Sequence, residues 1–327
     1  MKLLQIKKTD MKRDIKKRIK RNQQGKCALS DSELSDNYSM IDTDRVVLKM
    51  NGGTYTDENT RIVDPVEHMK RHGNYRERQE ELRELKIMVD GREQLLKTVN
   101  GISNRLLAMK RGVDEMDKVT FDMLNAQLDV AISHIGKADR RIDKYVKSMV
   151  NPMAQTAIKI KGLGAMTIAY MLVYVDVTKA RYASSVWAYC GYDKASRERY
   201  KKGVEGGGSK KMRAALYRMA DSMIKTRAVY RDVYDREKGK LEVSEKMVIS
   251  RNTQGKEVEV MWKETKPCHR HGAAIRKMIK HFLADWWMVY RTIEGLTTEP
   301  LYVQDKMGHK GIIQPEQRGW DIKIKDI

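Results

Sequence analysis

The segment "IKIKGLGAMTIAYML" places Gly162-Leu163-Gly164 between two apolar stretches, with Lys159 and Lys161 directly before the turn. A glycine turn at the start of a helix leaves backbone N–H groups free, and these groups bind phosphate together with the helix dipole. Glycine also permits positive φ and lets a nucleic-acid backbone approach without obstruction by Cβ. The pattern predicts a phosphate-binding site of the helix-hairpin-helix kind. A plain turn between two helices, with no ligand, is the alternative.

Lysine and arginine are concentrated near the N-terminus and around a glycine-rich stretch in the second half of the chain. Residues 11–26 alone hold eight Lys or Arg against one Asp. Such side chains gain affinity for nucleic acids by displacing counterions from phosphates. We expect nucleic-acid contacts from Lys12, Arg13, Lys16, Lys17, Arg18, Lys20, Arg21, Arg45, Lys159, Lys161, Gly162, Gly164, Arg197, Arg199, Lys201, Lys202, Lys210, Lys211 and Arg213.

The overall charge points to the same class of partner. The 327 residues include 65 Lys or Arg against 44 Asp or Glu, which gives a net charge of +21. This imbalance favours a polyanion, DNA or RNA, over a basic protein without such a role. The sequence has no apolar run of about 18 residues and no signal-peptide pattern, so we expect no membrane partner and a location in the host cytoplasm or nucleoid.

The three cysteines form no CxxC pair, which argues against a disulfide framework or a zinc knuckle and is typical of a reducing compartment. Cys268-His269-Arg270-His271 contains potential metal ligands. At such tight spacing and without a second cluster, they are better interpreted as surface residues near the start of a helix.

The elements that must position these residues fall into four regions, and they predict a mainly α protein with a small α+β module. Residues 1–75 contain a basic helix, strand and turn signals, and a helix that begins at Pro65 with Asp64 as its cap. Residues 151–292 predict a helical domain with a β-hairpin insertion at 241–265 that turns at Gln254-Gly255. The tail, 293–327, is expected to be irregular.

Residues 76–150 predict a long antiparallel helical hairpin. Apolar residues recur there every three or four positions, which is the pattern of an amphipathic coiled coil. Such a hairpin is a spacer or a dimerisation arm, so we expect a homo-oligomer. The predicted inner residues are Leu82, Leu85, Val89, Leu96, Val99, Ile102, Leu106 and Met109 on the first helix, and Phe121, Leu124, Leu128, Ile132, Ile135, Ile142, Tyr145 and Met149 on the second.

Residues 155–292 resemble the helix-hairpin-helix domain of bridge-RNA-guided insertion-sequence transposases. The resemblance is carried by "IKGLGAMTIAYMLVYVDVTKARYASSVWAYCGY", "GGGSKKMRAALYRMADSMIKTRAVYRDVYDREKGK" and "AAIRKMIKHFLADWWMVYR". It implies DNA recombination, a guide RNA and a serine nucleophile, for which Ser196 is the candidate. The chain departs from the family: the proline before the serine is missing, Ser196 comes early, and the N-terminal RuvC-like domain has no counterpart.

Residues 26–74, "KCALSDSELSDNYSMIDTDRVVLKMNGGTYTDENTRIVDPVEHMKRHGN", are similar to HNH endonucleases of the ββα-metal type. The resemblance implies that Asp44 and His68 hold a divalent cation such as Mg²⁺, and that Asn59 orients the catalytic base. The base position is Arg45, however, and arginine does not deprotonate in proteins.

The zinc-knuckle cysteines of the family are also incomplete. Cys27 remains, and Asp64 and Glu67 stand where the second pair would fall. The simplest interpretation is an HNH fold that has lost its catalytic residues and binds DNA. The alternative is that the match to the HNH family arose by chance.

Four hypotheses follow from these residues. The first, which we favour, is a DNA-binding protein of mobile-element or phage type without an intact catalytic site. The second is a metal-dependent HNH nuclease that uses His68 or His72 as base. The third is an active transposase or recombinase that uses Ser196. The fourth is a structural assembly protein built on the helical hairpin.

Overall fold

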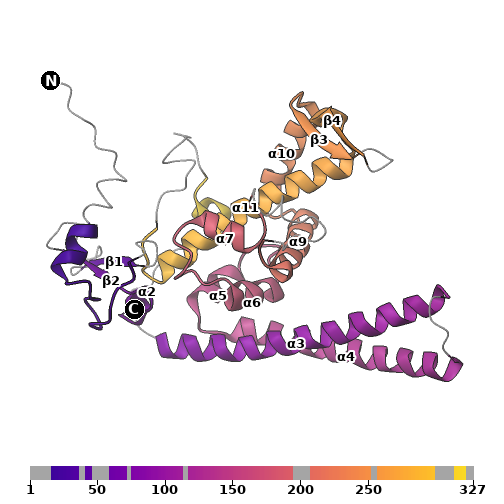
Figure 1. Ribbon diagram of the computed structural model, residues 1–327, viewed down its shortest axis with the longest axis horizontal. Helices are drawn as coiled ribbons and strands as arrows, with labels where there is room; N and C mark the ends of the chain where they lie inside the picture. The colour runs from indigo at the N-terminus through magenta and orange to yellow at the C-terminus, as the bar shows by residue number, and fades with distance from the viewer. Residues whose placement is uncertain are drawn as a thin grey trace.

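The computed structural model describes residues 16–36, 41–45, 59–71, 75–112, 117–193, 207–251, 256–298 and 313–321. Over these residues the chain is mainly helical and carries two separate two-stranded antiparallel sheets (Figure 1), so the predicted fold class is confirmed. In the residues that the structure describes, no helix combines the length and the apolar character that a membrane span requires.

The N-terminal module is a small ββα unit. Strand β1 (Asp42–Arg45) pairs antiparallel with β2 (Thr60–Val63), and α2 (Pro65–Arg71) follows directly. The predicted cap of α2 is confirmed, because the Asp64 carboxylate accepts hydrogen bonds from the N–H groups of Val66 (2.8 Å) and Glu67 (3.3 Å). A helical stretch at 16–22 packs on this unit. The shared core consists of Ile19, Cys27, Leu34, Ile41, Ile62 and Val63.

The predicted helical hairpin is present. It consists of α3 (Tyr75–Lys110) and α4 (Lys118–Ser148), which lie side by side and project beyond the rest of the molecule (Figure 1). The inner seam differs from the prediction at two places: Ile132 is exposed and Ala131 is buried instead, and Val146 is buried although it was not predicted. Ala131 follows Leu124 by seven residues, two helical turns, and therefore keeps to the seam, whereas Ile132 is rotated out of it.

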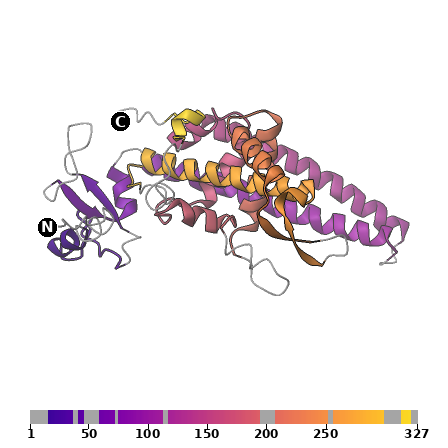
Figure 2. The same ribbon diagram turned by 90° about the horizontal axis from the view of Figure 1, so that it is seen from above.

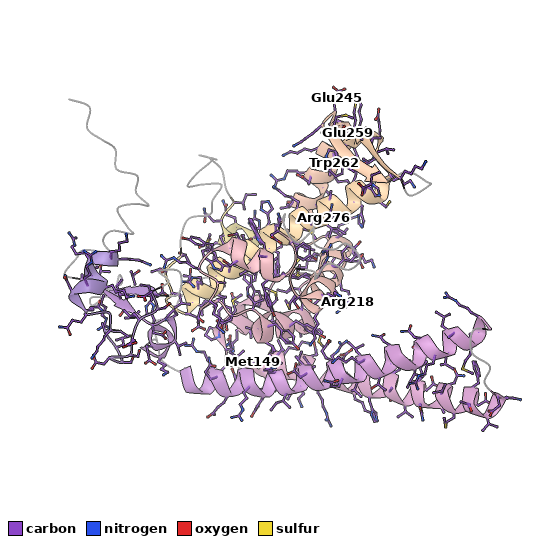
Figure 3. All side chains as sticks on the ribbon, viewed as in Figure 1. Met149, Arg218, Glu245, Glu259, Trp262 and Arg276 are labelled. Carbon is purple, nitrogen blue, oxygen red and sulfur yellow. The ribbon has the colours of Figure 1, made fainter. Side chains whose placement is uncertain are left out.

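The helical domain is built around α11 (Pro267–Ile293), which runs through the middle of the molecule (Figure 2). Its buried face carries Trp286 and Trp287. The helices packed around it are α5 (Pro152–Ala157), α6 (Ala165–Tyr174), α7 (Ala183–Tyr189), α9 (Lys210–Lys225) and α10 (Arg231–Val243). Met149, labelled in Figure 3 where the hairpin meets this domain, is also buried in the shared core.

The predicted β-hairpin is present as an arm at the far end of α10 and α11 (Figure 1). Strand β3 (Met247–Arg251) pairs with β4 (Glu257–Met261), and a 3-10 turn, η3 (Trp262–Glu264), leads into α11. The predicted start at residue 241 is wrong, because α10 continues to Val243. The expected turn at Gln254-Gly255 lies outside the described residues.

The tail is more ordered than the sequence suggested. Residues 313–321 contain the short 3-10 helix η4 (Pro315–Arg318) and pack on the helical domain. The Arg318 guanidinium contacts both carboxylate oxygens of Asp285 on α11, at 3.0 and 2.8 Å. The indole N–H of Trp320 donates to the Tyr230 hydroxyl at 2.6 Å. These long-range contacts replace the irregular tail expected for this segment.

Candidate functional site

The structure brings Asp44 and His68 together in the core of the ββα module. His68 Nε2 on α2 lies 3.3 Å from Asp44 Oδ1 on β1, and both side chains are only 2 % exposed. The other ring nitrogen, Nδ1, lies 3.4 Å from Asp42 Oδ2. Asp42 was not among the predicted site residues. Its signal was nevertheless in the sequence, since residues two apart on a strand point to the same face.

Both aspartates are also bound by arginines. Arg61 stands opposite Asp44 in the β1–β2 register and contacts Asp44 Oδ2 through Nε and Nη2, each at 2.9 Å. Asp42 Oδ1 lies 3.4 Å from Nη2 of Arg291, near the end of α11, and accepts hydrogen bonds from the backbone N–H (3.2 Å) and the hydroxyl of Thr297. No local pattern predicted these last two partners.

Arg291 is itself held in place by main-chain oxygens. Its Nη1 donates to the carbonyl of Val177 at 2.6 Å, and its Nε donates to the carbonyl of Thr297 at 2.8 Å. A further link between the modules is the hydrogen bond from Arg181 Nη1 to the Ile41 carbonyl at 2.9 Å. The cluster therefore joins the ββα module to the helical domain.

The charges in this cluster stabilise one another. Burial alone would lower the pKa of His68, but its hydrogen bonds to Asp42 and Asp44 and their negative charges raise it above the usual value. Burial alone would raise the pKa of Asp42, yet the hydrogen bond from His68 and the charge of Arg291 hold it below the usual value. The two carboxylates therefore shift His68 toward its protonated form.

This arrangement fits an internal ion-pair network better than a catalytic metal centre. Carboxylate oxygens of Asp42 and Asp44 lie within 3.4 Å of the two ring nitrogens of His68, and Arg61 already binds the other oxygen of Asp44. A catalytic metal also needs open coordination positions for water and substrate, which side chains this buried do not provide. In the described ranges no group of three or more His, Cys, Asp or Glu side chains is placed to hold a metal ion.

The structure describes some of the other residues that the nuclease resemblance singled out. Asn59 is half-buried directly before β2, and the backbone of Arg45 pairs with Thr60 at the end of the ladder. Cys27 and Asp64 do meet, because the Asp64 N–H donates to Cys27 Sγ at 3.2 Å. Glu67 pairs with Lys70 at 2.6 Å. The side chain of Arg45 and all of His72 lie outside the described residues.

The two glycines of the Gly-Leu-Gly turn have different roles. Gly162 has φ +81°, and a Cβ there would lie 2.7 Å from Thr226 Oγ1 and 2.9 Å from Met223 Cα, both near the end of α9. Gly164 has φ −78° and is the N-cap of α6, so the expectation of positive φ at this position is wrong. A Cβ at Gly164 would meet nothing within 4 Å. Packing against α9 therefore requires glycine at position 162. At Gly164 the start of α6 is open on the side where a Cβ would lie.

The cations near this turn are mostly exposed. Lys161 is exposed, and Lys159 forms a surface ion pair with Asp321 at 3.3 Å. Lys210 and Lys211 are exposed in the first turn of α9, which packs against α6. Lys211 also lies 4.9 Å from the centre of the Tyr174 ring. Half-buried Arg213 donates to the Gly191 carbonyl at 3.4 Å.

The basic N-terminal helix presents fewer charges to solvent than expected. Lys16 and Lys20 are buried, and Lys20 Nζ contacts Asp36 (3.0 Å) and the Ser35 carbonyl (2.9 Å). The apolar side of this short helix is narrow, so Lys16 and Lys20, which lie next to Ile19 on the helix, are buried together with it. Lys17 is half-buried, while Arg18 and Arg21 are exposed. The remaining predicted contacts lie outside the described residues, as does the candidate nucleophile Ser196; these contacts are Lys12, Arg13, Arg197, Arg199, Lys201 and Lys202.

The Cys268–His271 segment opens α11, as expected, and its histidines turn to different partners. His269 Nδ1 is 2.8 Å from the Ser250 hydroxyl, and His271 Nδ1 is 2.8 Å from the Tyr234 hydroxyl. Cys268 is exposed. The segment thus fastens the β-hairpin arm and α10 to α11.

Comparison with known proteins gives no family. No family model matches the chain, and no curated protein matches it.

Proposed function

We propose that this chain is a nucleic-acid-binding protein of mobile-element or phage type that holds DNA through phosphate contacts without cutting it. The observation that carries the proposal is the division of its charges. The residues that resemble a nuclease site are engaged in a buried network, whereas cations near the starts of α6 and α9 are exposed. Phosphate contacts of this kind position a nucleic acid and carry little sequence information.

The turn at Gly164 supports the proposal. The helix start is open on the side where a Cβ would lie, and the exposed Lys161 is three residues away. Backbone N–H groups and a lysine are a suitable combination for a phosphate oxygen. With a net charge of +21, we expect weak sequence preference and strong dependence on salt. We further propose that copies of the chain associate through the α3–α4 hairpin.

A metal-dependent nuclease is the second candidate, and one observation favours it. The 3.3 Å separation of His68 Nε2 and Asp44 Oδ1 is short enough for both atoms to bind one cation after His68 loses a proton. Asp42 would then be the carboxylate that orients the metal-binding histidine. The serine-type transposase hypothesis rests on Ser196 and gains no support from the described residues.

The test is a binding assay with the full chain on labelled duplex and single-stranded DNA at several salt concentrations, with and without Mg²⁺. Lys161→Glu combined with Lys210→Glu is expected to weaken binding at least tenfold. Loss of two phosphate contacts should also reduce the slope of log K against log salt by about 1.8. The control is Lys147→Glu, an exposed lysine on α4 paired with Asp143, which should change little.

Two results would contradict the proposal. Absence of salt-sensitive binding at low ionic strength would exclude nucleic acid as the partner. Mg²⁺-dependent cleavage that disappears in Asp44→Asn, with the fold verified by circular dichroism, would establish the nuclease instead.

A further inference from the structure

Three tyrosine rings are exposed on neighbouring helices of the helical domain. Tyr182 directly precedes α7, Tyr189 is the last residue of α7, and Tyr217 lies in the middle of α9; they are 50 %, 41 % and 48 % exposed. No other Phe, Trp or Tyr in the described ranges is exposed. Single apolar residues on a surface are ordinary, but here every exposed aromatic residue of these ranges lies on one pair of helices.

The fold itself does not account for these rings. The other tyrosines that the structure describes are buried or half-buried, and each hydroxyl has a hydrogen-bond partner. Tyr230, for example, donates to Asp285 at 2.6 Å inside the helical domain. Among the described residues, by contrast, none is hydrogen-bonded to the hydroxyl of Tyr182 or Tyr217. Their rings and hydroxyls are therefore left for contacts outside the chain.

The end of α7 and the start of α9 form one continuous surface. The N–H of Ser209, the N-cap of α9, donates to the carbonyl of Tyr189 at 2.6 Å. Gly208 packs so closely on this end of α7 that a Cβ would lie 2.6 Å from the backbone nitrogen of Gly191. This close packing brings the exposed Lys210, which follows the cap, next to Tyr189.

The exposed side of α9 continues this surface. Its exposed residues are spaced by four, three and one positions, which keeps them on one side of the helix; they are Lys210, Ala214, Tyr217 and Arg218. Arg218 is labelled in Figure 3 at the outer surface of α9. Tyr217 lies about 10 Å beyond Lys210 along the helix, from a rise of about 1.5 Å per residue. We call the exposed side of the two helices the tyrosine face; it consists of Tyr182, Tyr189, Lys210, Ala214, Tyr217 and Arg218.

The tyrosine face belongs to a strongly basic stretch of the chain. Residues 179–218 hold 11 Lys or Arg against three Asp or Glu. Further along α9, the charge of Asp221 is offset by an ion pair with Lys225 at 2.6 Å. The face therefore combines aromatic rings with positive charge. The chemistry that complements it is a polyanion that also carries flat, accessible rings.

From this combination we infer that the tyrosine face binds single-stranded nucleic acid. Unpaired bases stack on the rings of Tyr182, Tyr189 and Tyr217, and the phosphates of the same strand contact Lys210 and Arg218. A duplex presents phosphates but keeps its bases stacked on one another, so it gains nothing from exposed rings. The inference rests on the proposed function and adds the form of nucleic acid that the chain binds.

The test compares the affinity of the full chain for labelled oligo(dT) and for a labelled duplex of the same length, by fluorescence anisotropy at one low salt concentration. The wild type is expected to bind both. Tyr189→Ala combined with Tyr217→Ala should weaken binding to oligo(dT) at least tenfold, since each lost stack weakens it about fivefold or more. Duplex binding should change less than twofold. Tyr189→Phe combined with Tyr217→Phe keeps both rings and should bind oligo(dT) like the wild type.

The control is Val243→Ala combined with Ile249→Ala. These residues, on α10 and β3, are 74 % and 70 % exposed and lie outside the tyrosine face. Their substitution also removes exposed apolar surface, and it should leave both affinities unchanged. Circular dichroism verifies that all variants are folded.

Four outcomes would overturn the inference. They are an unchanged affinity of the double alanine variant for oligo(dT), equal losses for oligo(dT) and duplex, a wild type that binds the duplex alone, and tighter binding to poly-glutamate than to oligo(dT). The third leaves the proposed function intact, and the fourth indicates an acidic protein partner. Absence of binding to either DNA contradicts the proposed function itself, and the inference with it.

A second test leaves the tyrosine face unchanged. Oligo(dT) in which some bases are replaced by iododeoxyuridine is bound to the wild-type chain and irradiated, which links the base to an aromatic ring stacked on it. Mass spectrometry of the linked peptides should identify Tyr182, Tyr189 or Tyr217. Crosslinks confined to other parts of the chain would contradict the assignment of this face.

Discussion

Asp42→Ala tests whether the buried cluster holds the ββα module against the end of α11. The wild-type carboxylate accepts from Thr297 and lies 3.4 Å from both His68 Nδ1 and Arg291 Nη2. All of these groups except Thr297 are almost fully buried. The substitution therefore removes the Asp42 counter-charge from Arg291 and one of the two carboxylates beside His68, where both of these side chains are almost fully buried.

The expected loss of unfolding free energy is large. Removing one partner of a buried ion pair costs about 3–5 kcal/mol, because the remaining charge stays desolvated. Asp42→Asn keeps an acceptor oxygen and should cost less, about 1–3 kcal/mol. The control is Asp36→Ala, which breaks the ion pair of Lys20 with a fully exposed aspartate. Pairs with one exposed partner contribute about 0–1 kcal/mol.

The assay is urea denaturation of the full chain, followed by hydrogen exchange of the amides in β1, β2 and α2. Asp42→Ala should lower the midpoint for these elements more than for the α3–α4 hairpin. A loss below about 1 kcal/mol, or one no larger than that of Asp36→Ala, would refute the reasoning. The cluster would then be a consequence of docking and not its cause.

Two further predictions use the same measurements. The pKa of His68 is raised in the folded chain. Its contribution to the free energy of unfolding is therefore complete below the unfolded-state pKa of about 6.5 and is lost as pH rises through the folded-state pKa. The urea midpoint of the ββα module should fall above pH 6.5, and His68→Gln should show no such fall. Gly162→Ala should cost about 2–5 kcal/mol, from strain at positive φ and overlap with α9. Gly164→Ala should cost under about 1 kcal/mol while weakening DNA binding. Equal stability losses for the two glycine variants would contradict the assigned roles.

Several features could be predicted from the sequence because they depend on neighbouring residues. The three- and four-residue spacing of Leu85, Val89 and their successors specifies the helical hairpin, and Asp64-Pro65 specifies the start of α2. The alternation of β3 and β4 gives the β-hairpin arm. In each case the signal and the structure lie within a few residues of one another.

The candidate site depended on residues that are distant in the chain. The sequence alone determined that the chain is strongly basic, and its resemblance to HNH endonucleases predicted that Asp44 and His68 lie together. Only the tertiary structure decided that Asp42 meets Arg291, 249 positions away, and that Gly162 packs against the end of α9. Burial and ion pairing are properties of the packed chain, since a charge changes its role when distant helices remove it from water. This is why the same residues predict a metal site in the sequence and form an internal network in the fold.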